Sequence, residues 1–210
     1  MIAPHSALSA DPEPWAAVVT GAAVGIGAAI SRRLCEHGWN VVGLGRSAST
    51  LNRTCAGLRG LPGSFAGVVG DVRCEDDVAK LFETTVAEFG RVCAVVSNSG
   101  IAGPTAPVAD TNLADWQAVI ATNLTGAFLT VRAAVPYLRQ AGWGRIVLIS
   151  STTGKNPVAG RSAYAASRTP SVSTSGGRFL GLGLLESASA AVASGVVEHT
   201  VEPAAVDHAD

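Results

Sequence analysis

The sequence predicts a single-domain α/β fold built on a doubly wound parallel sheet. Its 210 residues suffice for one sizeable core and are too few for two ordinary domains. Short β-branched runs alternate along the chain with longer stretches of helical periodicity, as repeated βα units require. The short runs are continuously apolar, which is typical of strands that are buried on both faces of a parallel sheet.

The elements follow in order along the chain. Five runs are expected to be strands, at residues 16–20, 40–45, 64–70, 92–97 and 145–150. In the first of the helices between them, Ile26, Ile30 and Leu34 share one face, and a similar stripe marks residues 78–89. A third helix carries the longest stripe, which is expected to face the core: Trp116, Val119, Ile120, Leu124, Phe128, Val131, Val135 and Leu138.

Composition excludes several classes of function. The formal net charge of −1 gives no electrostatic reason to expect a nucleic-acid partner. The four cysteines form no C-x-x-C pair and do not cluster with histidines, so we expect no metal site and free thiols in a reducing cytoplasm. Residues 1–14 lack the regions of a secretion signal and are expected to be a disordered lead-in. No apolar run approaches the roughly 20 residues that span a bilayer, so no membrane association is expected.

A glycine-rich turn, TGAAVGIG at residues 20–27, follows the first expected strand and opens the first expected helix. Gly21 and Gly25 allow a tight turn whose backbone can approach a pyrophosphate. The amide groups at the start of the helix, around Ile26, offer partial positive charge to phosphates. Gly27 lets the helix pack closely on the strand. The turn therefore predicts dinucleotide binding in a Rossmann-type fold.

The spacing of this turn, G-x-x-x-G-x-G, resembles that of the short-chain dehydrogenase/reductase family. The resemblance extends over about residues 15–168 through four further segments, GDV at 70–72, SNSG at 97–100, NLTG at 123–126 and ISS at 149–151. SNSG differs from the family's N-N-A-G at two positions. The resemblance implies further cofactor contacts from Asp71, Val72, Asn98 and Gly100.

The end of the second expected strand bears on the choice of cofactor. An acidic residue here would hydrogen-bond the adenosine ribose and repel a 2′-phosphate. This chain has Gly45 followed by Arg46, and an arginine fork suits a phosphate in both charge and geometry. The alternative is a solvated arginine at a strand end. We predict NADP in preference to NAD.

The resemblance also implies a reaction centre. Tyr164 would be the acid/base, Ser151, thirteen residues upstream, would hydrogen-bond the substrate oxygen, and Asn123 would hold a water for proton relay. One helical turn after the tyrosine, the family has a lysine that hydrogen-bonds the nicotinamide ribose and lowers the tyrosine pKa. Arg168 stands there instead. It keeps the charge and a place among the cofactor contacts, but it is larger, planar and unable to give up its proton. We therefore expect reduced catalysis rather than a clean loss.

Residues 169–210 depart from the family. The resemblance implies a long helix after the tyrosine, then two more strands and a substrate lid, but Pro170 and several glycines interrupt that helix. Residues 184–195 are a better local helix, and Pro203 stands for the family's proline loop or matches it by chance. The last strands are expected to be altered or missing. Truncation, a shifted reading frame and a working variant all stay open.

Three functions compete at this stage. The first is an NADP-dependent oxidoreductase acting on a ketone or secondary alcohol, a 3-oxoacyl substrate included. The second is a nucleotide-binding relative with impaired catalysis, and the third is a defective product. The resemblance implies a homo-oligomer formed through two helices, residues 112–139 and the stretch after Tyr164. The glycines of that second stretch predict a poorly defined association instead.

Overall fold

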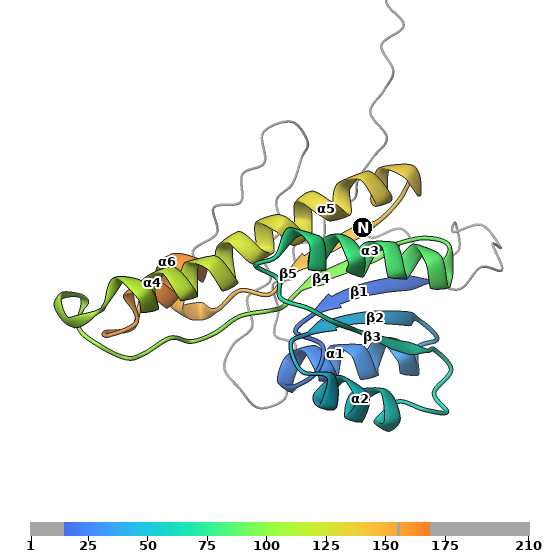
Figure 1. Cartoon of the computed structure of the whole chain (residues 1–210), viewed down its shortest axis with the longest axis horizontal. Coiled ribbons are helices and arrows are strands. Elements are labelled where there is room, and N and C mark those ends of the chain that lie inside the picture. Colours follow the sequence, from blue (N-terminus) through green and yellow to red (C-terminus); the bar gives the residue numbers. More distant parts are fainter. Residues whose placement is uncertain (1–14, 155, 169–210) are drawn as a thin grey trace, which may run out of the picture.

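The computed structural model describes residues 15–154 and 156–168. Within them, parallel strands form one sheet in the order β3-β2-β1-β4-β5 (Figure 1). The strands are β1 (Ala16–Thr20), β2 (Asn40–Gly45), β3 (Phe65–Val69), β4 (Ala94–Ser97) and β5 (Arg145–Leu148). The doubly wound parallel sheet and its five expected strands are confirmed. The expectations for residues 1–14 and 169–210, the helix at 184–195 included, lie outside the described residues.

Burial follows the position of each strand in the sheet. The central strand β1 is buried throughout, because it has a strand on either side and helices above and below. β3 lies at an edge of the described sheet, and its Val69 is 49% exposed. The expectation that every strand is buried on both faces is therefore wrong for β3, since an edge strand has a neighbour on one side only.

Helices cover both faces of the sheet. α1 (Gly25–Glu36) and α2 (Ala48–Gly57) lie on one face, and α3 (Glu75–Phe89) and α5 (Gly126–Gln140) on the other (Figure 1). The buried residues of α1 are Gly27, Ser31 and Cys35, and each of them directly follows a residue of the expected face. Ile26 is 49% exposed, which corrects its predicted place in the packed face.

The core has one apolar cluster on each face of the sheet. On the α3 and α5 side, Phe82 stacks on Tyr137 with 5.4 Å between ring centroids. On the α1 side, Val19, Cys35 and Val41 belong to the second cluster. The stripe expected over residues 78–89 is confirmed as core, because its central members are buried against the sheet.

The third expected helix is a continuous helical stretch of α4 (Leu113–Ile120), a π-helical turn (Ala121–Thr125) and α5. Its core residues include Leu129, Ala134 and Leu138, whereas Phe128 is 41% exposed. The expectation that the stripe faces the core holds for Val119, Val131 and Leu138, which are buried, and is wrong for Phe128. By length and composition alone, Leu113–Gln140 could cross a membrane. One face of this stretch is buried in the core, which explains its apolar character.

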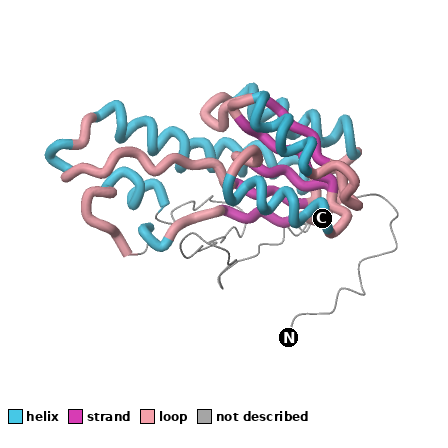
Figure 2. Tube along the Cα trace, turned by 90° about the horizontal axis from the view of Figure 1, so that it is seen from below, coloured by secondary structure: helices cyan, strands magenta, loops and turns pink. Residues whose placement is uncertain are grey.

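Two helices extend the molecule past the carboxyl ends of the strands. α4 and α6 (Ser162–Arg168) pack against each other there, beyond the sheet (Figures 1 and 2). At the opposite end of the sheet, where the strands begin, the Trp15 ring centroid lies 5.1 Å from that of Trp39 and 4.9 Å from that of Trp143. These indoles immediately precede β1 and β2 and lie close before β5, so they join the starts of three strands.

Candidate cofactor and reaction site

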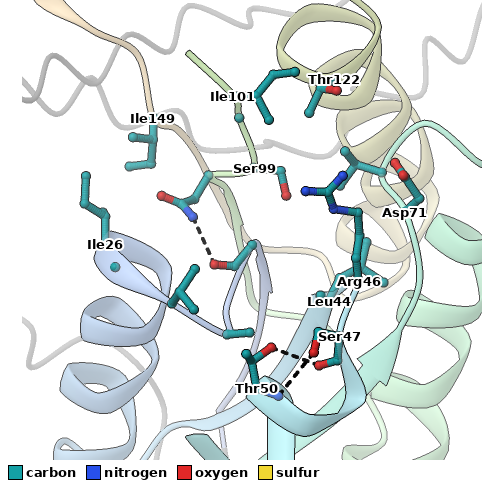
Figure 3. A pocket seen from close by; sticks show the side chains of 18 of the residues that line it. Ile26, Leu44, Arg46, Ser47, Thr50, Asp71, Ser99, Ile101, Thr122 and Ile149 are labelled. Carbon is teal, nitrogen blue, oxygen red and sulfur yellow. Dashed lines mark hydrogen bonds between the residues drawn. The ribbon is translucent and has the colours of Figure 1, made fainter. Parts of the chain in front are cut away.

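A cavity of about 590 Å³ opens at the carboxyl ends of the strands (Figure 3). It lies where the strand order reverses between β1 and β4, the point at which open α/β sheets bind ligands. Most of the predicted site residues line it: Gly21, Gly25, Ile26, Arg46, Asp71, Val72, Asn98, Gly100, Tyr164 and Arg168. Gly27, Asn123 and Ser151 are not among its lining residues.

The glycine-rich turn has the backbone that its sequence suggests. Gly21 and Gly25 have φ angles of 66° and 55°, a region that side chains with a Cβ rarely adopt. A Cβ on Gly27 would overlap the carbonyl oxygen of Gly21, so only glycine lets α1 approach the turn this closely. The Asn98 side chain donates to the Thr20 carbonyl at 3.0 Å. Asn98 thus fixes the turn as well as lining the cavity.

Charged side chains gather at the end of the cavity formed by β2 and β3. Arg46 is exposed and points toward Asp71 (Figure 3). The Asp71 carboxylate is bound by Arg73, with 2.7 Å between Arg73 Nη2 and Asp71 Oδ2. This side-chain hydrogen bond holds the pKa of Asp71 below its ordinary value, and the charge of Arg46 acts in the same direction. Asp71 is therefore committed to Arg73, while Arg46 makes no ion pair with any described residue.

Asn123 lies in the π-helical turn and is buried. Its Oδ1 accepts a hydrogen bond from the Ile101 amide at 2.8 Å, and its Nδ2 donates to the Ile101 carbonyl and the Ser167 hydroxyl, both at 2.9 Å. The Ser167 hydroxyl in turn donates to the carbonyl of Tyr164 at 2.8 Å. Both amide hydrogens are therefore used within the protein, and Asn123 joins the loop after β4 to the helix that carries Tyr164.

The two serines after β5 have different surroundings. Ser150 lines the cavity together with Tyr164, and its hydroxyl donates to the Arg168 carbonyl at 2.7 Å. Ser151 is half-buried, and its Oγ accepts a hydrogen bond from the Thr153 amide at 3.2 Å. The family spacing pointed to Ser151, whereas the described cavity wall is made by its neighbour.

Arg168 is held against three elements. Its Nη1 donates to the Ile149 carbonyl at 2.7 Å, and its guanidinium carbon lies 5.5 Å from the centroid of the Tyr164 ring. A Cβ on Gly100 would overlap Nη2, so the guanidinium rests on that glycine. The positive charge one turn after the tyrosine is therefore close to the ring, as the sequence suggested.

Several lining residues escaped the sequence analysis. They are Ser47, Thr50, Ile101 and Thr122, while Ser99, Ile149 and Ser150 lie in predicted motif segments but were not named as site residues. The Ser47 hydroxyl accepts a hydrogen bond from the Thr50 amide and begins α2, so a helix-start signal was available at that position. Ile101 and Thr122 come from segments that meet only in the folded chain, and no local pattern marks them.

Comparison with known proteins is consistent with this geometry. The sequence profile described as short chain dehydrogenase matches residues 15–173. The chain is 41% identical over 152 residues to cis-4-hydroxycyclohexanecarboxylate dehydrogenase of Sinomonas cyclohexanicum, covering 72% of this chain and 61% of that protein. The chain thus spans about three fifths of the length of the curated relatives it matches.

Solved structures give the same picture. A metagenomic short-chain oxidoreductase in complex with NADP has a TM-score of 0.70 and 36% identity, covering 75% of this chain and 70% of that one. An NAD⁺-bound xylitol dehydrogenase has a TM-score of 0.72 and 30% identity, covering 74% of this chain and 60% of that one. Both nicotinamide cofactors therefore occur among proteins with this fold.

Proposed function

The chain belongs to the short chain dehydrogenase family, and from that premise we propose that it is an NADP-dependent oxidoreductase acting on a small carbonyl compound or secondary alcohol. The observation that carries the choice of cofactor is Arg46, a cation after the end of β2 that makes no ion pair within the described part of the chain, at the position where an NAD-binding fold would have an acidic residue. Its guanidinium suits a 2′-phosphate in charge and shape.

The residues around the cavity fit such a nucleotide. The turn at Gly21 and Gly25 lets the backbone come close to a pyrophosphate, and α1 begins there with free amide groups. Ser47 and Thr50 line the cavity next to Arg46 and add hydroxyl groups for the adenosine ribose or its phosphate. When bound, the nicotinamide would supply or accept the hydride.

Tyr164 would move the proton. In the reduction, its hydroxyl gives a proton to the carbonyl oxygen while the carbonyl carbon gains the hydride, and the product is an alcohol. Ser151 is the candidate for the hydrogen bond to that oxygen, because its hydroxyl hydrogen is not used in the bond it accepts from Thr153, whereas Ser150 donates its hydrogen to the Arg168 carbonyl. Because Arg168 keeps a positive charge at the tyrosine ring but not the compact ammonium of a lysine, we propose that turnover is slow.

The substrate class stays broad. The named relative from Sinomonas acts on a hydroxyl group of a cyclic carboxylate, which makes a cyclic hydroxy acid or its ketone the first candidate. A 3-oxoacyl compound belongs to the same carbonyl class and is the second. We place the protein in the cytoplasm, a proposal supported by its four free cysteines. The family resemblance favours a homo-oligomer, but we propose a poorly defined association in place of a closed one, because glycines interrupt the stretch after Tyr164.

NADPH oxidation with a panel of ketones tests the proposal. The variant Tyr164→Phe should lose turnover and keep NADP binding, because it removes the proton donor and retains the ring. Tyr137→Phe is the matched control, since Tyr137 stacks in the core away from the cavity and should leave turnover intact. Retained turnover in Tyr164→Phe would place the chemistry elsewhere.

The second candidate function is nucleotide binding with impaired catalysis, and the observation that favours it is Arg168 at the lysine position. An increase in the thermal transition temperature with NADP, without any turnover across the ketone panel, would support this alternative.

A further inference from the structure

We propose that the Arg168 side chain occupies the space that a nicotinamide ribose needs, so that the cavity draws its affinity from the adenosine 2′-phosphate half of the nucleotide. The inference rests on the proposed binding of NADP and makes Arg168 a residue that determines which part of the ligand is recognised. Entry of the nicotinamide half would then require the guanidinium to move.

The place of the guanidinium is fixed by its contacts. Nη1 is 2.7 Å from the Ile149 carbonyl oxygen at the end of β5, and Nη2 rests on Gly100 in the loop after β4. The guanidinium carbon lies 5.5 Å from the centroid of the Tyr164 ring, within the range of a cation–π contact. Each of these partners also lines the cavity. The guanidinium therefore lies against the cavity wall next to the proposed proton donor.

The backbone of Arg168 is held as well. Its carbonyl oxygen accepts a hydrogen bond from the Ser150 hydroxyl at 2.7 Å. The preceding residue, Ser167, is buried and hydrogen-bonded to Asn123. The start of the side chain is therefore fixed by the backbone, and its far end is held by the contacts of the guanidinium.

One group of the guanidinium remains unsatisfied. The Arg168 Nε is buried and has no hydrogen-bond partner among the residues that the structure describes. A buried donor without a partner is unfavourable, so the contacts with Ile149, Gly100 and Tyr164 outweigh it. A lysine ammonium is a compact point charge and would present neither this planar bulk nor the second terminal nitrogen on Gly100.

The two ends of the cavity carry different side chains. Figure 3 shows Arg46, Ser47 and Thr50 at one end and Ile149 and Ile101 at the other. Arg46 is exposed and makes no ion pair with any described residue, so it is free to bind a phosphate. The two ends thus differ in chemistry, with a free cation at the adenosine end and a bound one at the ribose end.

Calorimetric titration of the full chain with NADP⁺ and with adenosine 2′,5′-bisphosphate tests this inference. In the wild type the two dissociation constants should agree within about threefold, because the nicotinamide half adds little. In Arg168→Lys, NADP⁺ should bind about tenfold more tightly, while the affinity for the bisphosphate stays unchanged. Arg161→Lys is the matched control, since Arg161 lies one turn before Tyr164 outside the cavity lining, and should keep the wild-type ratio.

The outcomes separate this inference from the proposed function. NADP⁺ binding more than about tenfold tighter than the bisphosphate in the wild type would overturn the inference and leave the proposed cofactor intact. Binding of neither nucleotide would overturn both. If Arg168→Lys does not fold, the wild-type comparison decides alone, and near-equal affinities support the inference.

Discussion

Asn123 shows how much of the site depends on one buried side chain. Its amide joins both backbone groups of Ile101 to the Ser167 hydroxyl, and through Ser167 to the carbonyl of Tyr164. The loop after β4 and the helix of the tyrosine are thereby held in one arrangement. The residue that the family resemblance assigned to a proton relay also has this supporting role.

Replacement of Asn123 by alanine should destabilise the fold by about 1–3 kcal/mol, because the half-buried amide and carbonyl of Ile101 lose their side-chain partner and the buried Ser167 hydroxyl keeps only its bond to Tyr164. Urea unfolding followed by circular dichroism measures the change. Asn112→Ala is a useful reference, since it removes the exposed cap of α4 and should cost only about 1 kcal/mol. Equal stability of Asn123→Ala and the wild type would show that these hydrogen bonds are not needed.

Arg46 gives the second prediction at this scale. Arg46→Asp should reverse the cofactor preference, with NADP binding weakened by about tenfold or more, since a charged hydrogen bond is replaced by repulsion. Titration with NADP⁺ and NAD⁺ measures the two affinities. Arg53→Asp makes the same change of charge on α2 outside the cavity lining, and should preserve the preference. A wild type that prefers NAD would contradict the prediction outright.

At the scale of elements, the strands and the buried face of α3 were predictable, whereas the faces of α1 and α5 were predicted only in part. Continuous β-branched runs such as residues 16–20 and 40–45 identify central strands, because few other structures bury every side chain. α2 escaped detection because Leu51 is its only buried residue, and its start depends on the Ser47 cap instead. In α1 and α5 the prediction was wrong for Ile26 and Phe128, which are exposed, because apolar periodicity does not show where a glycine or a serine lets two backbones approach.

The site was predictable to a similar degree. Motif spacing selected the residues of the turn and Tyr164, since each of them belongs to a short motif whose members lie close together along the chain. It selected Ser151, and it did not show that Ser150 lines the cavity, because neighbouring residues at the end of a strand point in different directions and this depends on the fold. Nor did it reveal that the Arg168 guanidinium rests on Gly100, a contact between distant segments.

The indoles at the amino edge give a prediction for the elements they join. Trp15→Ala should lower the free energy of unfolding by about 2–3 kcal/mol, less than a fully buried tryptophan would, since Trp15 is only half-buried. Trp15→Phe keeps a ring and should lose less. Guanidinium unfolding monitored by circular dichroism compares them. Identical midpoints for alanine and phenylalanine would mean that the ring contacts contribute nothing.

For the molecule as a whole, Cys35 predicts how stability changes at alkaline pH. Burial raises the pKa of its thiol to about 11 from an ordinary value of 9.0. Between these two values the unfolded thiol ionises and the folded one stays neutral, so stability is full below pH 9 and falls as the pH rises toward 11. A difference of this size corresponds to about 2–3 kcal/mol.

Cys35→Ala should therefore flatten the decline of stability between pH 9 and 11 relative to the wild type, whatever its effect at neutral pH. Unfolding curves at a series of pH values give the slopes. Cys74→Ala is the control, because Cys74 is exposed and should leave the wild-type slope unchanged. Parallel slopes for Cys35→Ala and the wild type would contradict the prediction.

The separation of the indole cluster from the cavity has an optical consequence. Two of the chain's other three tryptophans, Trp39 and Trp143, have ring centroids 5.1 and 4.9 Å from that of Trp15, at the amino ends of the strands and opposite the glycine-rich turn. The emission of these three indoles arises from the amino ends of the strands, whereas Trp116 lies in α4, beyond the carboxyl ends. The emission of the indole cluster reports whether the starts of β1, β2 and β5 are together. A ligand that binds at the other end of the strands should leave it nearly unchanged.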